Sequence, residues 1–448
     1  MVVPTASPLS RRRYLPVPLK LTICLLLATA WLALSLMLAW PWLQDLARWV
    51  GWPGAWFAVA GLALIPGYAN AFLVSALLFD RRPRFVIPER PPPVSVLIAA
   101  YNEEDCICDT LKSFADKPYP AALEILVIDD GSKDRTREVV RNFMATTQLP
   151  ATLTLRLLEM PANGGKARAL NHGLAQARHD YIVTVDADTL LYRDALLRLV
   201  ANQIGSPPNT GATAGSVLVR NSRKNFITRL QEWDYFLGIA VVKRIQSLLQ
   251  GTLVAQGAFS IYRKDVLIEA GGWSETMGED IVLTWAILKN GHRVGYAEDA
   301  IVFTNVPETY GAYYRQRKRW SRGMIEAFKR YPKVLTTPRL NLPFIYLNLA
   351  FPYLDFVYLF IFIPGVIAAL FFQSYVVVGL MTLLLLPLAI LCNTVMYTKQ
   401  RLIFQEHGLR VRHNLGGLVF FTLAYQLVMA PASLMGYLSE LINLRKSW

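Results

Sequence analysis

Two carboxylates one residue apart give this chain its clearest chemical signal. Asp186 and Asp188 follow a short apolar run that ends at Val185. Mg²⁺ prefers oxygen ligands and is usually shared between one or two carboxylates and substrate phosphates. We therefore expect Asp188 to bind Mg²⁺ or Mn²⁺ directly, and Asp186 to position a nucleotide ribose or the metal's water ligands. Because an Asp-x-Asp pattern also occurs by chance in many chains, the pair needs support from other residues.

Two more polar clusters follow apolar runs earlier in the chain. Asn and Asp before a helix often cap its free N–H groups, and for each cluster alone this interpretation is as good as a functional one. The same polarity at the ends of three runs favours one shared site. The two clusters are Tyr101-Asn102-Glu103-Glu104 and Asp129-Asp130-Gly131-Ser132.

A glycine pair and a later acidic turn each precede a helical stretch. Gly164 and Gly165 would let backbone N–H groups approach an anion at the helix start, beside the charge of Lys166. The Walker A spacing is absent, and taken alone an ordinary turn is the better interpretation. Glu279 and Asp280 open the later stretch, where a carboxylate is commonly a cap. The functional interpretation makes one of them the general base that deprotonates an incoming hydroxyl.

Residues 315–320, RQRKRW, place four cations within six positions. A solvated or lipid-facing helix is the ordinary explanation for such a run. Helical spacing, however, puts Gln316, Arg319 and Trp320 on one face. An amide, a guanidinium and an indole together suit a site that grips a diphosphate and stacks on a sugar ring.

Alternating strand and helix patterns must position these residues. Short apolar runs rich in β-branched residues predict strands, and the stretches between them predict helices. This order predicts an α/β fold with a mostly parallel sheet and helices on both faces. In such sheets ligands bind outside the carboxyl ends of the strands, where the acidic clusters fall. The expected strands are 94–99, 123–128, 153–158 and 181–185, and the expected helices include 136–144, 166–177 and 281–289.

Long uncharged runs predict a membrane protein. The chain is 54% hydrophobic and 17% charged, whereas a soluble protein carries about 25% charged residues. A helix that crosses a bilayer needs roughly 20 apolar residues. We expect five spans, one each from residues 21–40, 56–79 and 415–438, and two from 356–398 with a turn near Gln373. Residues 341–355 are expected to form an interfacial or broken segment.

The net charge of +14 lies beside these runs, which favours a membrane surface over nucleic acid as its partner. Basic flanks lie in the cytoplasm by the positive-inside rule. This rule predicts that residues 81 to about 340 are cytoplasmic, and that the loop 41–55 and Trp448 are outside. The first apolar run is longer than a signal-peptide core, so we expect an anchor. The basic flanks are Arg11–Arg13, Arg81, Arg82, Arg84, Lys399, Arg401, Arg410 and Arg412.

The ordered motifs YNEE, DDGS, GGKARAL, DAD, GED and QRKRW, between Val94 and Trp320, resemble those of the processive family-2 glycosyltransferases with the GT-A fold. The layout is most similar to that of the bacterial poly-β-1,6-N-acetylglucosamine synthases, and more distantly to the hyaluronan, chitin and cellulose synthases. The resemblance implies a UDP-sugar donor, a growing polysaccharide acceptor, Mg²⁺ or Mn²⁺, and a small accessory subunit in the bacterial inner membrane. By the same resemblance, the nucleotide is bound by Tyr101, Glu103, Asp130 and Lys166, the metal pair is Asp186 and Asp188, the catalytic base is Asp280, the diphosphate and acceptor are bound by Gln316, Arg319 and Trp320, and the acceptor sugar meets Gln256 and Gly257.

Gly278 departs from the family pattern, which commonly has Thr there, and this version resembles hyaluronan and chitin synthases more than cellulose synthase. The sugar and its linkage are therefore left open. Two other functions compete with polymerisation: transfer of a single sugar to a lipid phosphate, and a catalytically inactive scaffold. The expected regions are two membrane helices in 1–87, a GT-A catalytic domain in 88–310, amphipathic interfacial helices in 311–342, and about three membrane helices in 343–448.

Overall fold

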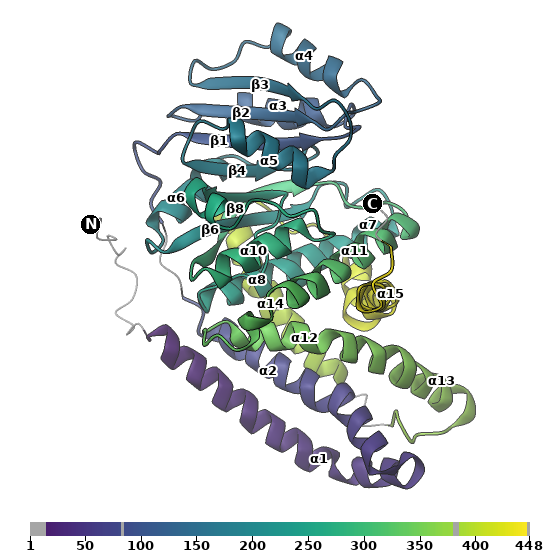
Figure 1. Ribbon diagram of the computed structural model, residues 1–448. Coiled ribbons are helices and arrows are strands. Elements are labelled where there is room, and N and C mark those ends of the chain that lie inside the picture. The colour runs from purple at the N-terminus through teal and green to yellow at the C-terminus, as the bar shows by residue number, and fades with distance from the viewer. Residues whose placement is uncertain (1–14, 82–84, 380–384, 446–448) are drawn as a thin grey trace.

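The protein is described by a computed structural model that covers residues 15–81, 85–379 and 385–445 (Figure 1). A large sheet with its helices occupies the upper part of Figure 1, and long apolar helices occupy the lower part. The basic residues Arg11–Arg13, Arg82 and Arg84, and the expected outside position of Trp448, lie outside the described residues.

Eight strands of the described chain form one sheet: β1 (Val94–Ala100), β2 (Leu123–Asp129), β3 (Leu153–Glu159), β4 (Tyr181–Val185), β5 (Leu190–Leu191), β6 (Thr210–Val219), β7 (Phe259–Arg263) and β8 (Arg293–Thr304). Their order is β3-β2-β1-β4-β7-β6-β8-β5. The first four neighbours run parallel, whereas β7 is antiparallel to both β4 and β6. β8 is parallel to β6, and β5 is antiparallel to β8. The sheet is therefore mixed rather than mostly parallel, because β7 reverses direction at its centre.

The four predicted strands are confirmed, and each ends within one residue of the expected position. Side chains of a strand alternate between its two faces. In β1, Leu97 contributes to one buried cluster together with Leu126, while Val96 and Ile98 contribute to the cluster on the other face. Both faces of the parallel half are thus buried, which explains why its strands read as continuous apolar runs.

Helices cover both faces of this sheet: α3 (Ile107–Ala115), α4 (Thr136–Thr146), α5 (Lys166–Gln176), α6 (Ala195–Gly205), α9 (Lys264–Glu269) and α10 (Glu279–Lys289). α5 lies close against β1 and β2 because Gly173 has no side chain. A Cβ at that position would lie 2.8 Å from Cδ1 of Ile128 and 3.1 Å from Cδ2 of Leu97. This close contact fixes the start of α5, and therefore Lys166, relative to the strand ends.

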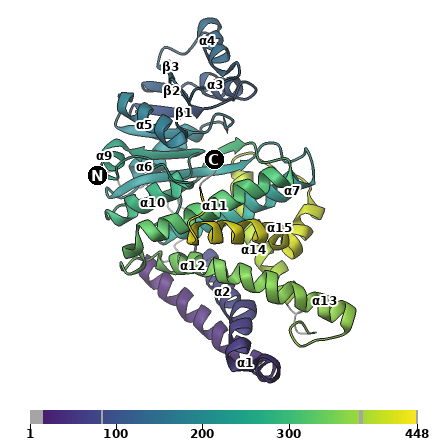
Figure 2. The same cartoon turned by 45° about the vertical axis from the view of Figure 1, so that its right-hand side comes forward.

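A layer of helices separates the sheet from the apolar helices below: α7 (Phe226–Trp233), the π-helical turn η2 (Asp234–Ile239), α8 (Ala240–Leu248), α11 (Tyr310–Arg330) and the short 3-10 turn η3 (Pro332–Leu335). Figure 2 shows α7 and α11 directly below the sheet. α11 carries the basic run, so this run lies where the sheet meets the lower helices.

The apolar helices are α1 (Val17–Val59), η1 (Ala60–Leu64), α2 (Ile65–Leu78), α12 (Leu342–Val357), η4 (Tyr358–Phe362), α13 (Ile363–Phe372), α14 (Leu385–Glu406) and α15 (Leu415–Leu441). Within the described ranges, three helical segments are long and apolar enough to cross a membrane: Val17–Leu78, Leu342–Phe372 and Leu415–Leu441. The first of these contains both predicted N-terminal spans, since the backbone of Gly51 leaves the helical region with φ 73° and lets the chain fold back.

Three details of the expected membrane region are wrong. The loop predicted at 41–55 is helical except at Gly51, because its apolar residues continue the periodic pattern of α1. Residues 342–355 belong to a continuous helix that passes through Pro352 and ends at Gln373, so they are not a separate broken segment. α14 continues to Glu406 and includes Lys399, which was expected in a loop; its last turns consist of good helix formers. The turn at Gln373 is confirmed.

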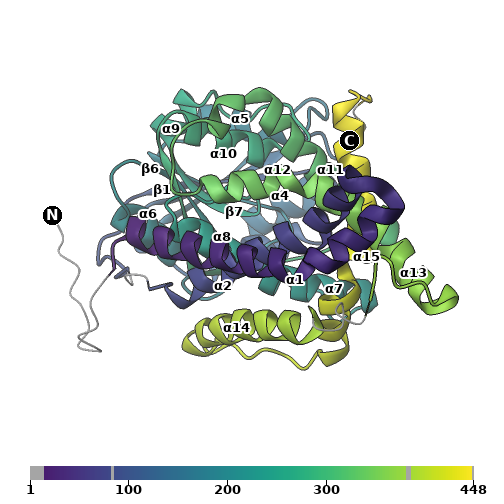
Figure 3. The same ribbon diagram turned by 90° about the horizontal axis from the view of Figure 1, so that it is seen from below.

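α15 packs along α11. Figure 3 shows that α15 runs at a large angle to α1. The hydroxyl groups of Tyr313 and Tyr425 lie 2.9 Å apart. At the other end of the pair, Nε of Arg322 donates to Glu440 over 2.7 Å in a buried ion pair. α15 therefore links the apolar region to the helix that carries the basic run.

Candidate active site

The loops after β1 and β2 are joined by hydrogen bonds at the carboxyl edge of the sheet. The side chain of Asn102, whose φ is 57°, accepts a 2.8 Å bond from the N–H of Lys133, and its own N–H donates to Oγ of Ser132. The N–H of Glu103 donates to Oγ1 of Thr136 over 2.8 Å. This network leaves Tyr101 39% exposed at the rim, where it can contact a planar ligand.

Asp130 organises the glycine loop before α5. Its Oδ1 and Oδ2 accept bonds of 2.7 and 2.8 Å from the N–H groups of Gly164 and Gly165. The anion that these two N–H groups hold is therefore the carboxylate of Asp130, which corrects the expectation that they await a ligand. Gly131 is required here, because with φ 70° a Cβ would lie 2.6 Å from the backbone N of Asn163.

Lys166 lies at the centre of the acidic residues. Its Nζ donates to Oδ1 of Asp186 and lies 3.8 Å from Oε1 of Glu279, so it joins the end of β4 to the start of α10. Burial opposes its charge, but Asp186 and Glu279 outweigh that effect and raise the pKa of Lys166. Burial also raises the pKa of Glu279, while Lys166 and Arg319 oppose the rise.

Asp188 is held from β8 rather than from its own strand. Its Oδ1 accepts from Oγ1 of Thr304 over 2.9 Å, and its Oδ2 accepts from the N–H of Asn305 over 3.3 Å. Burial and the nearby carboxylate of Asp186 raise the pKa of Asp188. Glu103 belongs to the same cluster: burial, followed by the charges of Asp188 and Asp186, raises its pKa to about 7.

This excess of negative charge fits a divalent cation. The charges of Asp186 and Asp188 help to raise the pKa of Glu103, and that of Asp186 helps to raise the pKa of Asp188. Lys166 forms an ion pair with Asp186 in this cluster. No group of three or more carboxylate, thiol or imidazole ligands is positioned to enclose a metal in the described ranges. Mg²⁺ commonly binds one or two carboxylates and completes its coordination with water and substrate phosphates. The residues present therefore fit a metal held by Asp188 and Asp186 together with a diphosphate.

Asp280 lies at the N-terminus of α10, where its Oδ1 accepts a 2.8 Å bond from the N–H of Ile281. The helix start is brought against α11 by two glycines. A Cβ on Gly278 would lie 2.8 Å from Cα of Gly323, and a Cβ on Gly323 would lie 2.6 Å from Cα of Gly278. The two backbones thus touch, which explains physically why a glycine occupies position 278.

The predicted face of α11 borders the same cluster. Burial raises the pKa of Glu279, and Arg319 is close enough to oppose part of that rise. Oε1 of Gln316 is buried without a hydrogen-bond partner in the described structure, so it is an acceptor that a ligand could use. The guanidinium of Arg317 lies 4.2 Å from the ring centre of Trp320, a cation–π contact that orients the indole.

The loop before β7 closes the site from another side. A Cβ on Gly257 would lie 2.9 Å from Nζ of Lys166, so the missing side chain leaves room above the lysine. Gln256 is fixed below: its Nε2 donates to the carbonyl of Gly215 over 2.8 Å, and its Oε1 accepts from Nζ of Lys243. Lys243 is buried, and that burial lowers its pKa to about 7, although Asp280 opposes the shift.

Residues 95–271 match the family described as glycosyl transferase family 2. These residues form a family 2 glycosyltransferase domain. They include the strands β1 to β4, the acidic pair and the Gln256-Gly257 loop.

The chain is also similar in sequence to two bacterial synthases. The chain is 32% identical over 251 residues to a poly-β-1,6-N-acetyl-D-glucosamine synthase of Staphylococcus epidermidis, covering 56% of this chain and 59% of that protein. It is also 32% identical over 260 residues to the synthase of that name from Staphylococcus aureus strain MSSA476, covering 56% and 61%. The match therefore spans about three fifths of each relative.

A solved structure shows that the fold is of the GT-A type. It is a mannosyltransferase from Pyrobaculum calidifontis in complex with GDP-Man and Mn²⁺, with a TM-score of 0.59 and 20% identity. The likeness covers 87% of this chain and 99% of that one. At this identity the likeness concerns the fold, which here includes the apolar helices as well as the glycosyltransferase domain.

Sequence reasoning missed Lys243 and Thr304, which support the site of the glycosyltransferase domain, and it missed the partners of Glu279 and Arg317. Glu279 was considered with Asp280 as a cap or general base, but its contact with Lys166 was not predicted. Lys243 and Thr304 belong to no motif, and the partner of Thr304, Asp188, lies 116 positions away. Arg317 lies in the basic run, but its pairing with Asp234 over 2.8 Å was not predicted. A buried charge is costly unless it is paired, but Lys243 stands beside Arg244 in a helix that also carries Gln246 and Ser247, so nothing local distinguishes it as a site residue.

Proposed function

We propose that the protein is a membrane-bound, processive, inverting hexosyltransferase that polymerises a UDP-sugar into a β-linked exopolysaccharide. UDP-N-acetylglucosamine is the proposed donor, and the polymer would pass across the bacterial inner membrane from a cytoplasmic catalytic domain. The observation that carries this proposal is the series of contacts from Asp186 through Lys166 to Glu279. Glu279 in turn interacts electrostatically with Arg319 of α11. Strand ends, the start of α10 and the basic helix thereby share one site.

The proposed roles follow from position. Tyr101 and Glu103 lie at the rim where a uracil and ribose would bind, while Asp130 shapes the loop that presents Lys166. Asp188 and Asp186 would hold Mg²⁺ or Mn²⁺, which when bound would neutralise charge that develops on the leaving diphosphate. Arg319 would bind the same diphosphate from the opposite side.

In the proposed reaction Asp280 accepts the proton of the acceptor hydroxyl. The hydroxyl oxygen then forms a bond to the anomeric carbon as the bond from that carbon to the UDP oxygen breaks, and UDP leaves with the bonding electron pair. Attack on the face opposite the leaving group inverts an α-linked donor into a β-linked product. Trp320, Gln316 and the Gln256-Gly257 loop would position the acceptor sugar.

The names of the relatives support N-acetylglucosamine as the sugar and a polymer as the product. Apolar segments on both sides of the glycosyltransferase domain support attachment to a membrane. A small accessory subunit in the membrane remains part of the proposal by resemblance.

The test is a panel of labelled UDP-sugars offered to the full chain reconstituted in lipid vesicles with Mg²⁺ or Mn²⁺, followed by analysis of product length and linkage. The proposal predicts long β-linked chains from UDP-N-acetylglucosamine. A product limited to one sugar on a chloroform-soluble lipid would contradict polymerisation and support a lipid-linked sugar transferase. Long chains from a different UDP-sugar would support a hyaluronan- or chitin-type synthase instead.

A further inference from the structure

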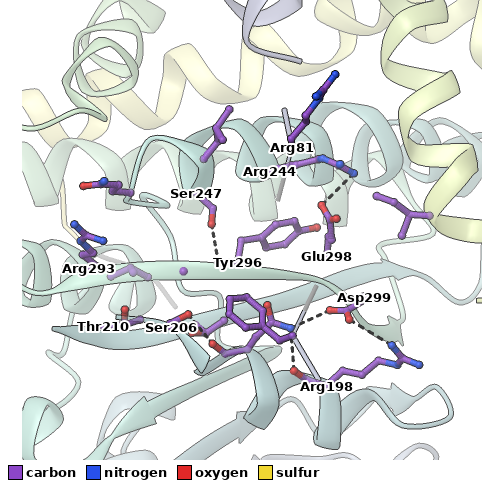
Figure 4. Close-up of a pocket in the computed structure, with 18 of the residues that line it drawn as sticks. Arg81, Arg198, Ser206, Thr210, Arg244, Ser247, Arg293, Tyr296, Glu298 and Asp299 are labelled. Atoms are coloured by element: carbon purple, nitrogen blue, oxygen red, sulfur yellow. Dashed lines mark hydrogen bonds and ion pairs between the residues drawn. The ribbon is translucent and has the colours of Figure 1, made fainter. Parts of the chain in front are cut away.

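A cavity of about 630 Å³ lies between the sheet and the ends of the apolar helices, separate from the active site (Figure 4). Its floor is formed by the beginnings of β6 and β8 and by α6 and α8. Its walls come from the start of α1, from Arg81 in the segment after α2, and from the last turns of α14. This volume is within the range of small-molecule sites.

The cavity is far from the glycosyltransferase site along β8. Residues of β8 from Arg293 to Tyr296, with Glu298 and Asp299, line the cavity, whereas Thr304 at the end of the strand bonds to Asp188. At about 3.3 Å per residue, the strand separates Asp299, the lining residue nearest to that end, from Thr304 by about 17 Å. A ligand in the cavity would therefore not overlap a donor sugar bound at the carboxyl edge.

Five cations line the cavity, but two of them are used by neighbouring carboxylates. Arg244 donates to Asp80 and lies 3.0 Å from Glu298. Arg198 lies 3.4 Å from Asp299. Figure 4 shows the contacts of Arg244 with Glu298 and of Arg198 with Asp299.

The other three cations keep their charge available. Arg81, Arg293 and Lys399 line the cavity, and within the described ranges none of them makes an ion pair. They come from the segment after α2, the start of β8 and the last turns of α14, so three distant parts of the chain bring positive charge to one cavity. Such a group of cations favours binding of a phosphate-bearing anion.

Apolar side chains line part of the cavity on the side of the membrane helices. Val17, Leu402 and Ile403 come from α1 and α14, next to the polar Glu406 and His407, and Phe85 lies against Gly205 of α6. A cavity that combines cations with apolar side chains suits a ligand that has an anionic head and apolar chains.

The position of the cavity along the apolar helices also favours a lipid as its ligand. α1 begins at Val17 and α2 ends at Leu78, so both ends of this hairpin lie on one side, next to the cavity. If the hairpin crosses the bilayer, the cavity lies at the height of the lipid headgroups, where cations attract anionic lipids.

We propose that this cavity binds the phosphate headgroup of an anionic phospholipid, with Arg293 and Lys399 contacting the phosphate and the acyl chains passing along α1 and α14. The site is distinct from the donor and acceptor sites, and its occupancy does not depend on the identity of the sugar.

The test uses the purified full chain in detergent with fluorescently labelled phosphatidylglycerol as the probe. The variant is the pair Arg293→Gln and Lys399→Gln, and the matched control is Arg401→Gln, an exposed cation on the same helix that does not line the cavity. Two charge-assisted hydrogen bonds are lost in the variant, so binding should weaken about a hundredfold, while the control binds as the unaltered chain does.

Competition distinguishes the source of the phosphate. Unlabelled phosphatidylglycerol should displace the probe, whereas phosphatidylcholine and water-soluble glycerol 3-phosphate at the same concentration should not. Equal displacement by glycerol 3-phosphate would overturn the lipid assignment in favour of a soluble phosphate. Equal weakening in the Arg401→Gln control, or undiminished binding in the double variant, would overturn the site itself. Lys399→Gln alone replaces the double variant if thermal unfolding shows that the latter is misfolded.

Discussion

The contact between Gly278 and Gly323 offers a sharp test of how α10 and α11 are held together. In the Gly323→Ala variant the new Cβ would lie 2.6 Å from Cα and 2.8 Å from N of Gly278. Carbon atoms prefer separations of about 3.5–4.0 Å, so the two helices must move apart by about 1 Å. Asp280 lies two residues from this contact, and Arg319 lies one turn away on α11.

The size of the effect follows from two opposing contributions. Replacing a helical glycine by alanine stabilises a helix by about 1 kcal/mol, but forced overpacking costs about 1–3 kcal/mol. Net stability should therefore change little or fall by about 2 kcal/mol. Catalysis should suffer more, because a displacement of about 1 Å in an active site can lower the rate about a hundredfold.

The assay compares sugar transfer and thermal unfolding in Gly323→Ala with those in Gly311→Ala. Gly311 lies on the same helix, and a Cβ there meets only Nη1 of Arg315, at 3.7 Å. The control should keep its activity and unfold at a slightly higher temperature. Activity in Gly323→Ala equal to that of the control would refute the idea that this backbone contact aligns Asp280 with Arg319.

Three further predictions concern the surroundings of the site. Gly257→Ala should displace Lys166, whose Nζ would lie 2.9 Å from the new Cβ, and should raise KM for the UDP-sugar by about tenfold or more in steady-state kinetics. An unchanged KM would show that the donor does not use the space beside Gly257. Arg317→Met should lower the free energy of unfolding by about 3–5 kcal/mol, because it leaves the buried Asp234 unpaired. Adding Asp234→Asn should restore part of this loss in denaturant titrations, and no recovery would show that the ion pair contributes little. The pKa of Glu103 is raised from 4.5 to about 7 in the folded protein, so its contribution to stability without metal is fully present below pH 4.5 and lost as the pH rises through about 7. Glu103→Gln should remove this part of the pH dependence of stability, and an identical profile of stability against pH in the variant would contradict the raised pKa.

The sequence was sufficient for the parts of the fold that are local. β1 and β2 are apolar runs with polar ends, and their boundaries followed from that contrast. The parallel order of neighbouring strands then placed the acidic clusters at one edge. The reversal at β7 was not predictable, because its five residues look like any short buried strand and its direction is decided by pairing with distant β4 and β6.

The site was predictable where chemistry shows in residue type, and not where it depends on packing. The pairing of Lys166 with Asp186 joins two motifs that were both recognised. Contacts between Asp188 and Thr304, or between Arg317 and Asp234, join residues more than 80 positions apart and leave no local pattern.

In the apolar helices, too, features that depend on packing could not be predicted from the sequence. Runs of apolar residues predicted that helices would form, but not where the helices would bend. Gly51 reverses the first pair of helices, whereas Pro352 stays inside a helix, since a proline in an apolar segment can be accommodated by neighbouring helices.

The most direct test of the central claim is sugar transfer by Asp280→Asn in lipid vesicles, with Asp265→Asn as the matched control on an exposed helix start. Loss of a general base should lower the rate of transfer by about 10²–10⁴-fold while binding of the UDP-sugar is retained, and the control should polymerise normally. Undiminished polymer from Asp280→Asn would contradict the proposed site.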